Sequence, residues 1–150
     1  SPRPRRPASM SSSASKSRSS HPHFDDRGTL EWTGSFSLGQ AQARREHKLI
    51  FIEFGREQCS QCRNLVQNVI PRPEVAELLK QHFVAVASDC DDAEPEVEAI
   101  AMNLSDATML PFVMVTDAEG RFLHGSSGGV DAQTLVRTLE RLVAQRQQVR

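Results

Sequence analysis

The feature that most constrains this chain is an apolar run that leads into two cysteines. Residues 49–54 read Leu-Ile-Phe-Ile-Glu-Phe, a nearly continuous apolar stretch that is typical of a β-strand buried on both faces. A short polar turn leads to Cys59-Ser60-Gln61-Cys62, and a segment with apolar residues at helical spacing follows. This order predicts a strand, a turn and a helix that opens at the cysteines. Residues three apart lie on one helical face, at a separation that a disulfide accepts.

The opening turn of a helix is a favourable place for a thiolate. Backbone N–H groups there have no partner within the helix, and the positive end of the helix dipole lies beside them. A cysteine in this position is therefore stabilised in its reactive, deprotonated form. We expect Cys59 to be the exposed nucleophile and Cys62, one turn further along, to be the resolving partner.

Three other interpretations of the motif stay open, and each has less support. A zinc site needs further ligands, but only Cys90 remains among the cysteines, and His47, His82 and His124 form no His-x-x-x-His pair. We therefore predict no metal site. A purely structural disulfide that closes so short a loop would constrain little of the unfolded chain. Two ordinary buried cysteines are the third interpretation, but the strand, turn and helix context favours redox chemistry.

Two further side chains near this motif carry chemistry. Glu53 interrupts the apolar run, and a buried carboxylate is costly unless it is paired or neutralised. Its side chain either points to a solvated edge of the sheet or serves the cysteines just downstream. Cys90 follows a second apolar run at 83–87. We expect it to be a half-buried bystander, and an additional redox or ligand role stays open.

Composition limits the classes of protein to consider. Residues 1–23 are rich in Ser, Arg and Pro, so we expect a disordered tail there, as a linker or a transit-peptide remnant, and a folded domain at 24–150. The values of 38% hydrophobic and 25% charged residues are ordinary for a globular domain. Beyond residue 20 there are 13 basic against 19 acidic groups, which argues against nucleic-acid binding. No apolar run approaches the ~18 residues that a membrane span requires.

The remaining segments alternate between helical and strand patterns. A short extended segment at 24–34 carries the only tryptophan, which we expect to pack against the body. Ser35 or Ser37 caps a helix that runs to about residue 48. We expect further helices from Pro73, Pro95 and Asp131, further strands at 83–87, 111–115 and 121–124, and a flexible loop at 125–129. Proline at the start of a strand suits a cis peptide bond between Leu110 and Pro111.

This order of elements, with Cys-x-x-Cys after the first long strand and a proline opening the third, resembles the thioredoxin fold. The resemblance covers about residues 30–146 and implies an α/β architecture, in which a central mixed sheet of four to five strands has helices on both faces. Residues 48–97 are most similar to single-domain thioredoxin-like proteins. They also resemble the C-terminal periplasmic domain of the bacterial transmembrane disulfide reductase, whose helix break is similar to Val69-Ile70-Pro71-Arg72-Pro73-Glu74-Val75. An exported, for example periplasmic, location is thereby slightly favoured over the cytoplasm.

The resemblance also implies roles for individual residues. Cys59 corresponds to the attacking cysteine and Cys62 to the resolving one. Glu53 occupies the position of the family's buried acid, which relays a proton for the resolving thiol. Pro111 corresponds to the cis-proline that faces the disulfide, where the substrate backbone pairs with the preceding residue, Leu110.

Other positions match the family less closely. Gly128 falls near the glycine of the third substrate-binding loop. Gln58 stands where an aromatic residue usually precedes the first cysteine, and Ser60-Gln61 replaces the usual Gly-Pro. We expect Gly128, Gln58, Ser60 and Gln61 to contact the substrate. Because positions 58, 60 and 61 differ from the family pattern, neither the redox potential nor the partner carries over from the family. A glutamate in place of the commoner aspartate also alters the geometry of the proton relay.

We therefore predict a thiol–disulfide oxidoreductase that exchanges its Cys-x-x-Cys pair with protein thiols and disulfides, including those of an upstream electron donor. The resemblance favours reduction over oxidation. The dithiol is itself the redox group, so we expect no metal or organic cofactor, and we expect a monomer. The main alternative is a redox-inactive binding or chaperone module of thioredoxin fold, supported by the missing aromatic residue and the unusual Ser-Gln pair. A zinc-binding domain is the third hypothesis.

Overall fold

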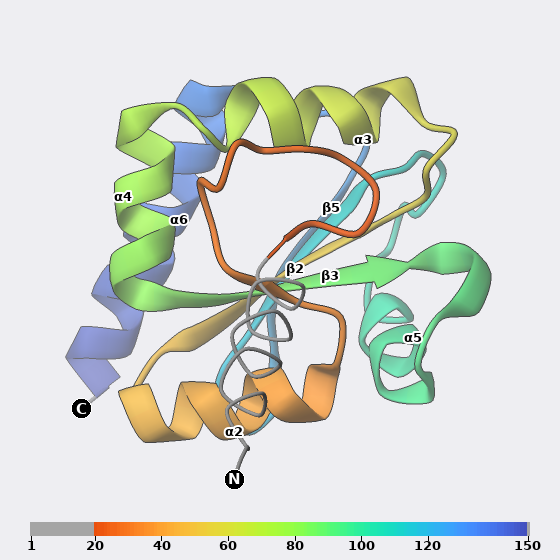
Figure 1. Ribbon diagram of the computed structural model, residues 1–150. Coiled ribbons are helices and arrows are strands. Elements are labelled where there is room, and N and C mark those ends of the chain that lie inside the picture. Colours follow the sequence, from red (N-terminus) through yellow and green to blue (C-terminus); the bar gives the residue numbers. More distant parts are fainter. Residues whose placement is uncertain (1–19, 150) are drawn as a thin grey trace, which may run out of the picture.

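One five-stranded sheet forms the centre of the molecule (Figure 1). The computed structural model describes residues 20–149. The strands are β1 (Trp32–Thr33), β2 (Leu49–Gly55), β3 (Phe83–Asp89), β4 (Phe112–Thr116) and β5 (Phe122–Ser127), and they lie in the order β1-β3-β2-β4-β5. β3 pairs in parallel with β1 and β2, whereas β4 is antiparallel to both β2 and β5. The predicted mixed sheet is confirmed.

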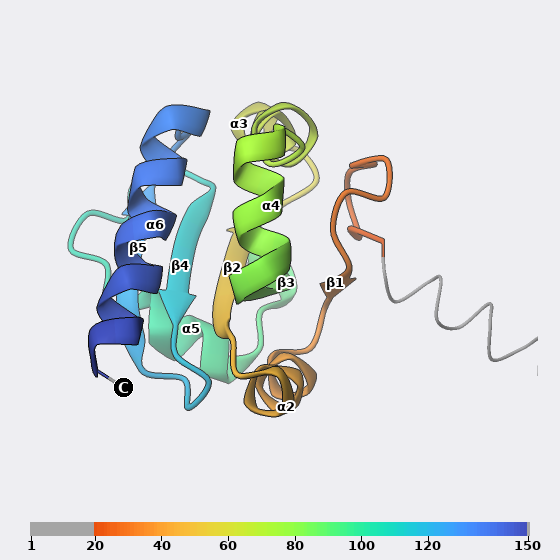
Figure 2. The same ribbon diagram turned by 90° about the vertical axis from the view of Figure 1, so that its left-hand side faces the viewer.

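Helices cover both faces of this sheet. They are α2 (Phe36–Glu46), α3 (Ser60–Asn64), the π-helical turn η1 (Leu65–Val69), α4 (Pro73–His82), the 3-10 turn η2 (Cys90–Asp92), α5 (Pro95–Ala101) and α6 (Ala132–Val149). Apolar side chains of η1, α4 and α6 pack on one face of the sheet, and those of α2 and α5 pack on the other. Figure 2 shows α4 and α6 side by side in front of the sheet. The predicted layers are therefore present.

Local sequence signals account for where most helices begin. The Ser35 hydroxyl accepts a hydrogen bond from the Leu38 N–H and so caps α2, as predicted. Pro73 and Pro95 occupy the first turns of α4 and α5, where a missing N–H costs nothing. Asp131 accepts from the Thr134 N–H before α6. These caps satisfy backbone groups that would otherwise lack a partner.

The boundary predicted at residue 23 is wrong, because residues 20–23 belong to the folded body. His21 is buried, and its ring contacts that of Trp32 at a centroid distance of 4.8 Å. A Ser-, Arg- and Pro-rich composition averages over the segment and hides a single buried residue such as His21. The rest of the predicted tail, residues 1–19, lies outside the described residues. The expected packing of Trp32 against the body is confirmed, since its side chain is buried.

The flexible loop predicted at 125–129 is also wrong in part. β5 continues through Ser127, and Gly125 lies opposite Met114 in the ladder with β4. Glycine and serine have low strand propensity, which led to the prediction of a loop, but pairing with a neighbouring strand overrides that preference. A side chain at Gly125 would collide with Phe122 and Leu104, so the small residue suits this close packing.

Candidate redox site

The two cysteines of the motif form a disulfide at the start of α3, directly after the end of β2. Their Cα atoms are 5.3 Å apart, within the usual range for a disulfide. Cys59 is half-buried, whereas Cys62 is fully buried. The predicted asymmetry is thus present, with one sulfur within reach of a partner and the other behind it. Exposure of this kind suits attack by Cys59 and resolution by Cys62.

Cys59 is the N-cap residue of α3. Its backbone is extended, with φ −153° and ψ 108°, and its Sγ accepts a hydrogen bond from the Cys62 N–H at 3.1 Å. A thiolate formed at this sulfur on reduction would keep the same backbone donor. The hydrogen bond therefore supplies a local reason for the stabilised thiolate that the sequence predicts.

Glu53 lies in the middle of the sheet and not at a solvated edge. β2 has β3 on one side and β4 on the other, and Glu53 is 1% exposed. The interpretation that placed its side chain in solvent is therefore wrong. Its Oε1 lies 2.7 Å from Nε2 of His21, while Oε2 is buried with no hydrogen-bond partner among the described residues. A buried carboxylate oxygen without a partner is costly, which marks the group for a functional role.

The peptide bond between Leu110 and Pro111 is cis, as predicted. Leu110 packs against a small apolar cluster of Phe24, Cys62 and Val66, and Cys59 packs against the same cluster. The N–H of Gly128, a residue with φ +91°, donates to the carbonyl of Pro111 at 3.0 Å. The structure therefore brings Leu110 beside the disulfide and Gly128 beside Pro111. The positive φ explains the glycine, because residues with a Cβ rarely adopt it.

The remaining predicted substrate contacts surround Cys59. Gln58, Ser60 and Gln61 are all exposed, and the side chain of Gln61 lies against Gly129. Together with Leu110 they form a rim of polar and apolar groups around the half-buried sulfur. Position 58 of this surface is glutamine, whereas an aromatic residue is usual at this position in the family.

Four residues near the site were not singled out from the sequence as part of it: His21, Phe24, Gly55 and Ser127. The Ser127 hydroxyl accepts hydrogen bonds from the N–H groups of Thr108 and Met109 and donates to the Met109 carbonyl, so it holds the loop before Pro111. No periodic pattern identifies such residues. The aromatic Phe24, three positions after His21, was the one available signal that this part of the chain packs on the body.

Cys90 directly follows β3. Because β2 and β3 are parallel, Cys90 lies at the same end of the sheet as the disulfide. It is half-buried, as predicted, and burial raises the pKa of its thiol, although the Arg56 guanidinium opposes this. Asp89, Cys90 and Asp91 are the one group of three adjacent potential metal ligands within residues 20–149. Arg56 donates two hydrogen bonds to the Asp91 carboxylate and lowers its pKa, so this carboxylate is already neutralised by a cation.

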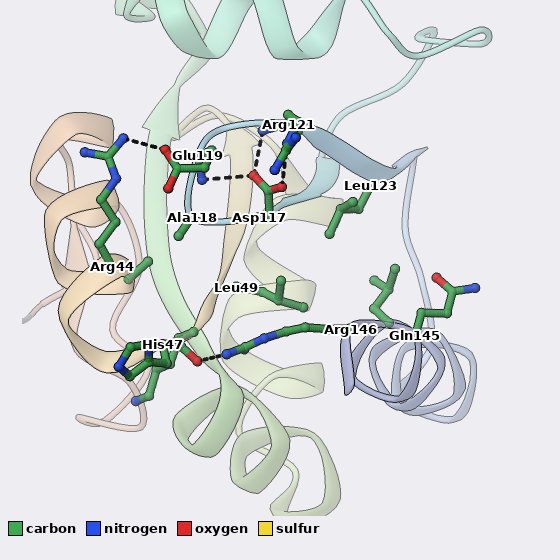
Figure 3. Close-up of a pocket in the computed structure, with 13 residues that line it drawn as sticks. Arg44, His47, Leu49, Asp117, Ala118, Glu119, Arg121, Leu123, Gln145 and Arg146 are labelled. Atoms are coloured by element: carbon green, nitrogen blue, oxygen red, sulfur yellow. Dashed lines mark hydrogen bonds and ion pairs between the residues drawn. The ribbon is translucent and has the colours of Figure 1, made fainter. Parts of the chain in front are cut away.

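A pocket of about 630 Å³ lies at the opposite end of the sheet, around the start of β2 (Figure 3). Its walls come from α2, α6 and the turn between β4 and β5. Its charged side chains are engaged with neighbours: Arg44 with Glu119, Arg121 with Asp117, and Arg146 with the carbonyl of His47. The whole length of β2 separates this pocket from the cysteines. None of the residues that line this pocket belongs to the redox site.

A disulfide at the start of a helix, a cis-proline whose preceding residue packs in the same apolar cluster as the cysteines, and a mixed sheet between two layers of helices define the thioredoxin fold. Comparison with protein families agrees, since residues 31–118 match the model of the Thioredoxin-like family. This match covers more than half of the chain, and the protein therefore belongs to the Thioredoxin-like family. No curated protein matches the chain significantly.

Solved structures with similar folds come from several bacteria. A thioredoxin from Thermus thermophilus is 17% identical, with a TM-score of 0.61 over 75% of this chain and 85% of that one. A disulphide isomerase from Xylella fastidiosa is 21% identical, with a TM-score of 0.57 over 71% and 87%. The C-terminal domain of Neisseria meningitidis DsbD, in its oxidised form, is 18% identical, with a TM-score of 0.54 over 70% and 90%. At these identities the comparisons establish the fold. Across residues 20–149, no helix has the length and apolarity to cross a membrane.

Proposed function

We propose that this protein is a thiol–disulfide oxidoreductase that reduces disulfides of partner proteins. The observation that carries the proposal is the Cys59–Cys62 disulfide, with one sulfur half-exposed as the helix cap and the other buried one turn behind it. Membership of the Thioredoxin-like family supports the thiol–disulfide chemistry. The reducing direction rests on the resemblance to single-domain thioredoxin-like proteins.

The reaction begins from the reduced protein. The Cys59 thiolate attacks one sulfur of the partner's disulfide, so that a mixed disulfide forms and the partner's other sulfur leaves as a thiolate. Cys62 then gives its proton to Glu53 and attacks Cys59 Sγ, which releases the second partner thiolate. The partner gains two electrons and the protein is left as the Cys59–Cys62 disulfide. A further thiol donor must return the protein to its dithiol form.

The substrate would bind across the exposed rim. We propose that an extended segment of the partner pairs with the backbone of Leu110, beside the cis-proline and Gly128. Gln58, Ser60 and Gln61 then contact the residues that flank the partner's cysteine. Polar side chains in this rim favour hydrogen bonding over the apolar contact that an aromatic residue would provide at position 58.

The experiment is to trap the mixed disulfide. In a background with Cys90→Ala, so that a single thiol remains, Cys62→Ser should accumulate mixed disulfides with a protein substrate such as insulin, whereas Cys59→Ser should accumulate almost none, because Cys62 is buried. Non-reducing electrophoresis and mass spectrometry provide the readout. The unsubstituted protein should reduce insulin catalytically in the presence of dithiothreitol.

Two results would count against this proposal. Equal trapping by the two variants would remove the assignment of attacking and resolving roles. An absence of cysteine-dependent turnover with insulin would support the alternative, a thioredoxin-fold binding or chaperone module.

A further inference from the structure

The side chain of His21 forms a buried pair with Glu53, although the two residues are 32 positions apart. Nε2 of the ring lies 2.7 Å from Oε1 of the carboxylate, and the side chains are 0% and 2% exposed. His21 comes from the segment before β1, which Figure 1 shows in red and orange near α3. Gln67 of η1 donates to the carbonyl of Asp25 and so holds this segment beside the helix.

The surroundings of the other ring nitrogen define how His21 is protonated. Nδ1 accepts hydrogen bonds from the backbone N–H groups of His23 and Phe24, at 3.1 and 3.2 Å. Because both neighbours are donors, Nδ1 must present its lone pair and carries no proton. The ring proton therefore lies on Nε2 and is donated to Glu53 Oε1. A doubly protonated ring would direct an N–H at two other N–H groups.

Packing keeps the ring in this orientation. It stacks on Phe24 at a centroid distance of 5.5 Å and meets the edge of Trp32 at 4.8 Å. Phe24 in turn packs against Cys62. The charged groups nearby are held by other partners: His23 faces Asp89 at 3.5 Å, Asp26 accepts from Trp32 Nε1, and Arg63 lies over the Phe24 ring.

While Oε1 contacts His21, the second oxygen of Glu53 lies close to the resolving cysteine. Glu53 Oε2 and Cys62 Sγ each lie 2.6 Å from the point that a Cβ on Gly55 would occupy. The two atoms therefore share one small space, which exists because residue 55 has no side chain. No hydrogen-bond partner for Oε2 is present among the described residues.

We propose that His21 is a positioning residue for the resolving step: it holds Oε1 of Glu53, so that Oε2 faces Cys62 and takes its proton. This inference rests on the proposed function. In the mixed disulfide, the Cys62 thiol transfers its proton to Oε2, the Cys62 thiolate attacks Cys59 Sγ, and the partner sulfur leaves as a thiolate. His21 keeps its own proton throughout.

Two substitutions at position 21 distinguish the contact of the imidazole with Glu53 from its hydrogen bonds with the backbone N–H groups of His23 and Phe24. His21→Asn keeps a short side-chain oxygen that can accept from the backbone N–H groups two and three residues later, but it cannot reach Glu53. His21→Gln places an amide N–H near the position of Nε2 and can still donate to Oε1. Comparison of His21→Asn with His21→Gln therefore tests the contact with Glu53 independently of the hydrogen bonds that the side chain of residue 21 makes with the backbone nearby. Glu53→Gln serves as the reference variant that lacks the proton acceptor.

The measurement follows the reaction of the reduced protein with dithiobis-nitrobenzoate by stopped-flow absorbance. All proteins carry the background substitution Cys90→Ala. Attack by Cys59 releases one coloured thiolate in a phase whose rate depends on reagent concentration. Resolution by Cys62 releases a second coloured thiolate, in a phase whose rate does not depend on reagent concentration. We expect Glu53→Gln to slow the second phase by about 100-fold and His21→Asn by about tenfold, with the first phase changed less than about twofold. His21→Gln should recover most of the loss.

The outcomes are distinguishable. If the unsubstituted protein shows no second phase that requires Cys62, the proposed function itself fails. If that phase is present and His21→Asn leaves it unchanged, or if His21→Asn and His21→Gln slow both phases equally, the positioning role is overturned.

A second measurement needs no variant and so does not depend on whether His21→Asn folds. Nitrogen-15 NMR of the unsubstituted protein should find the His21 ring neutral with its proton on Nε2, in both the oxidised and the reduced form. A doubly protonated ring, or a proton on Nδ1 in either form, would overturn the proposal.

Discussion

Glu53 and Cys62 come close to one another across Gly55, a residue at the end of β2 where the chain leaves the sheet. A Cβ at this position would lie 2.6 Å from both Oε2 and Sγ, which is closer than real atoms approach. The glycine is required here by space and not by its backbone conformation. A single hydrogen atom in place of a methyl group thus leaves the space in which the Glu53 carboxylate and the Cys62 sulfur approach one another.

Gly55→Ala should therefore impair both stability and resolution. We expect a loss of about 1–3 kcal/mol in the free energy of unfolding, because the methyl group overpacks a closed space, and a slower Cys62-dependent phase, because it separates the acid from the thiol. Urea denaturation and the two-phase thiol assay measure these effects.

Gly34→Ala is the matched control for this substitution. Nothing lies within 4 Å of a Cβ at Gly34, so the change should be close to neutral in both assays. A stable Gly55→Ala variant with normal resolution would show that the space between Glu53 and Cys62 is not needed.

At the scale of elements, the first helical turns carry much of the chemistry and of the local stability. Cys59 caps α3 with a sulfur atom where Ser35 caps α2 with a hydroxyl and Asp131 caps α6 with a carboxylate. The helix after the cysteines then widens, because Ile70 N–H donates to Leu65 O, five residues back. This turn faces the sheet with Leu65 and Val69, and the chain leaves the helix before Pro73.

The cap of α6 should make stability sensitive to acid. The backbone hydrogen bond from Thr134 holds the pKa of the Asp131 carboxyl below its ordinary value. A carboxyl whose pKa is lower in the folded state stabilises the protein above its unfolded-state pKa and loses this contribution as the pH falls through the folded-state pKa. Asp131→Asn keeps a capping oxygen without the charge, so its melting temperature should fall less steeply than that of the unsubstituted protein below about pH 4.

The control for this prediction is Asp106→Asn, since Asp106 is an exposed acid outside any helix. Thermal melts followed by circular dichroism between about pH 6 and pH 2.5 compare the three proteins. Parallel pH profiles for Asp131→Asn and the unsubstituted protein would contradict the role of the charged cap.

At the scale of the whole molecule, the segment before β1 joins the redox site to the outer edge of the sheet. His21 and Phe24 reach Glu53 and Cys62, whereas Trp32 lies in β1, beyond β3. The buried Asp26 connects these ends, because its carboxylate accepts hydrogen bonds from the N–H groups of Gly28 and Leu30 and from Trp32 Nε1. The segment is therefore part of the structure that supports the site.

Asp26→Ala should loosen this segment as a unit. Three donors would lose their acceptor, so we expect the free energy of unfolding to fall by about 2–3 kcal/mol. Fluorescence of the single Trp32 during urea denaturation reports the change, and resolution by Cys62 should slow because His21 belongs to the same segment.

The neighbouring acid provides the comparison. Asp25 is exposed and accepts from the Arg27 N–H, so Asp25→Ala should cost less than about 0.5 kcal/mol. Similar losses for the two variants would show that the buried carboxylate does not hold the segment.

Local patterns in the sequence were enough to predict most of the fold and the centre of the site. The Cys-x-x-Cys pair after an apolar run, the caps at Ser35 and Asp131 and the cis bond before Pro111 all depend on residues within a few positions of one another. Such signals can be read without knowing the tertiary structure, because a helical turn or a strand register is itself a local geometry.

Tertiary structure alone decided which distant residues complete the site. The contact of His21 with Glu53 spans 32 positions, and the hydrogen bonds that the Ser127 hydroxyl accepts from Thr108 and Met109 join β5 to the loop before Pro111. Neither belongs to a periodic pattern, because a segment without regular structure has no period that marks its buried side. Composition averaged over residues 1–23 therefore concealed His21, and only the folding of that segment against β2 brought it to the carboxylate.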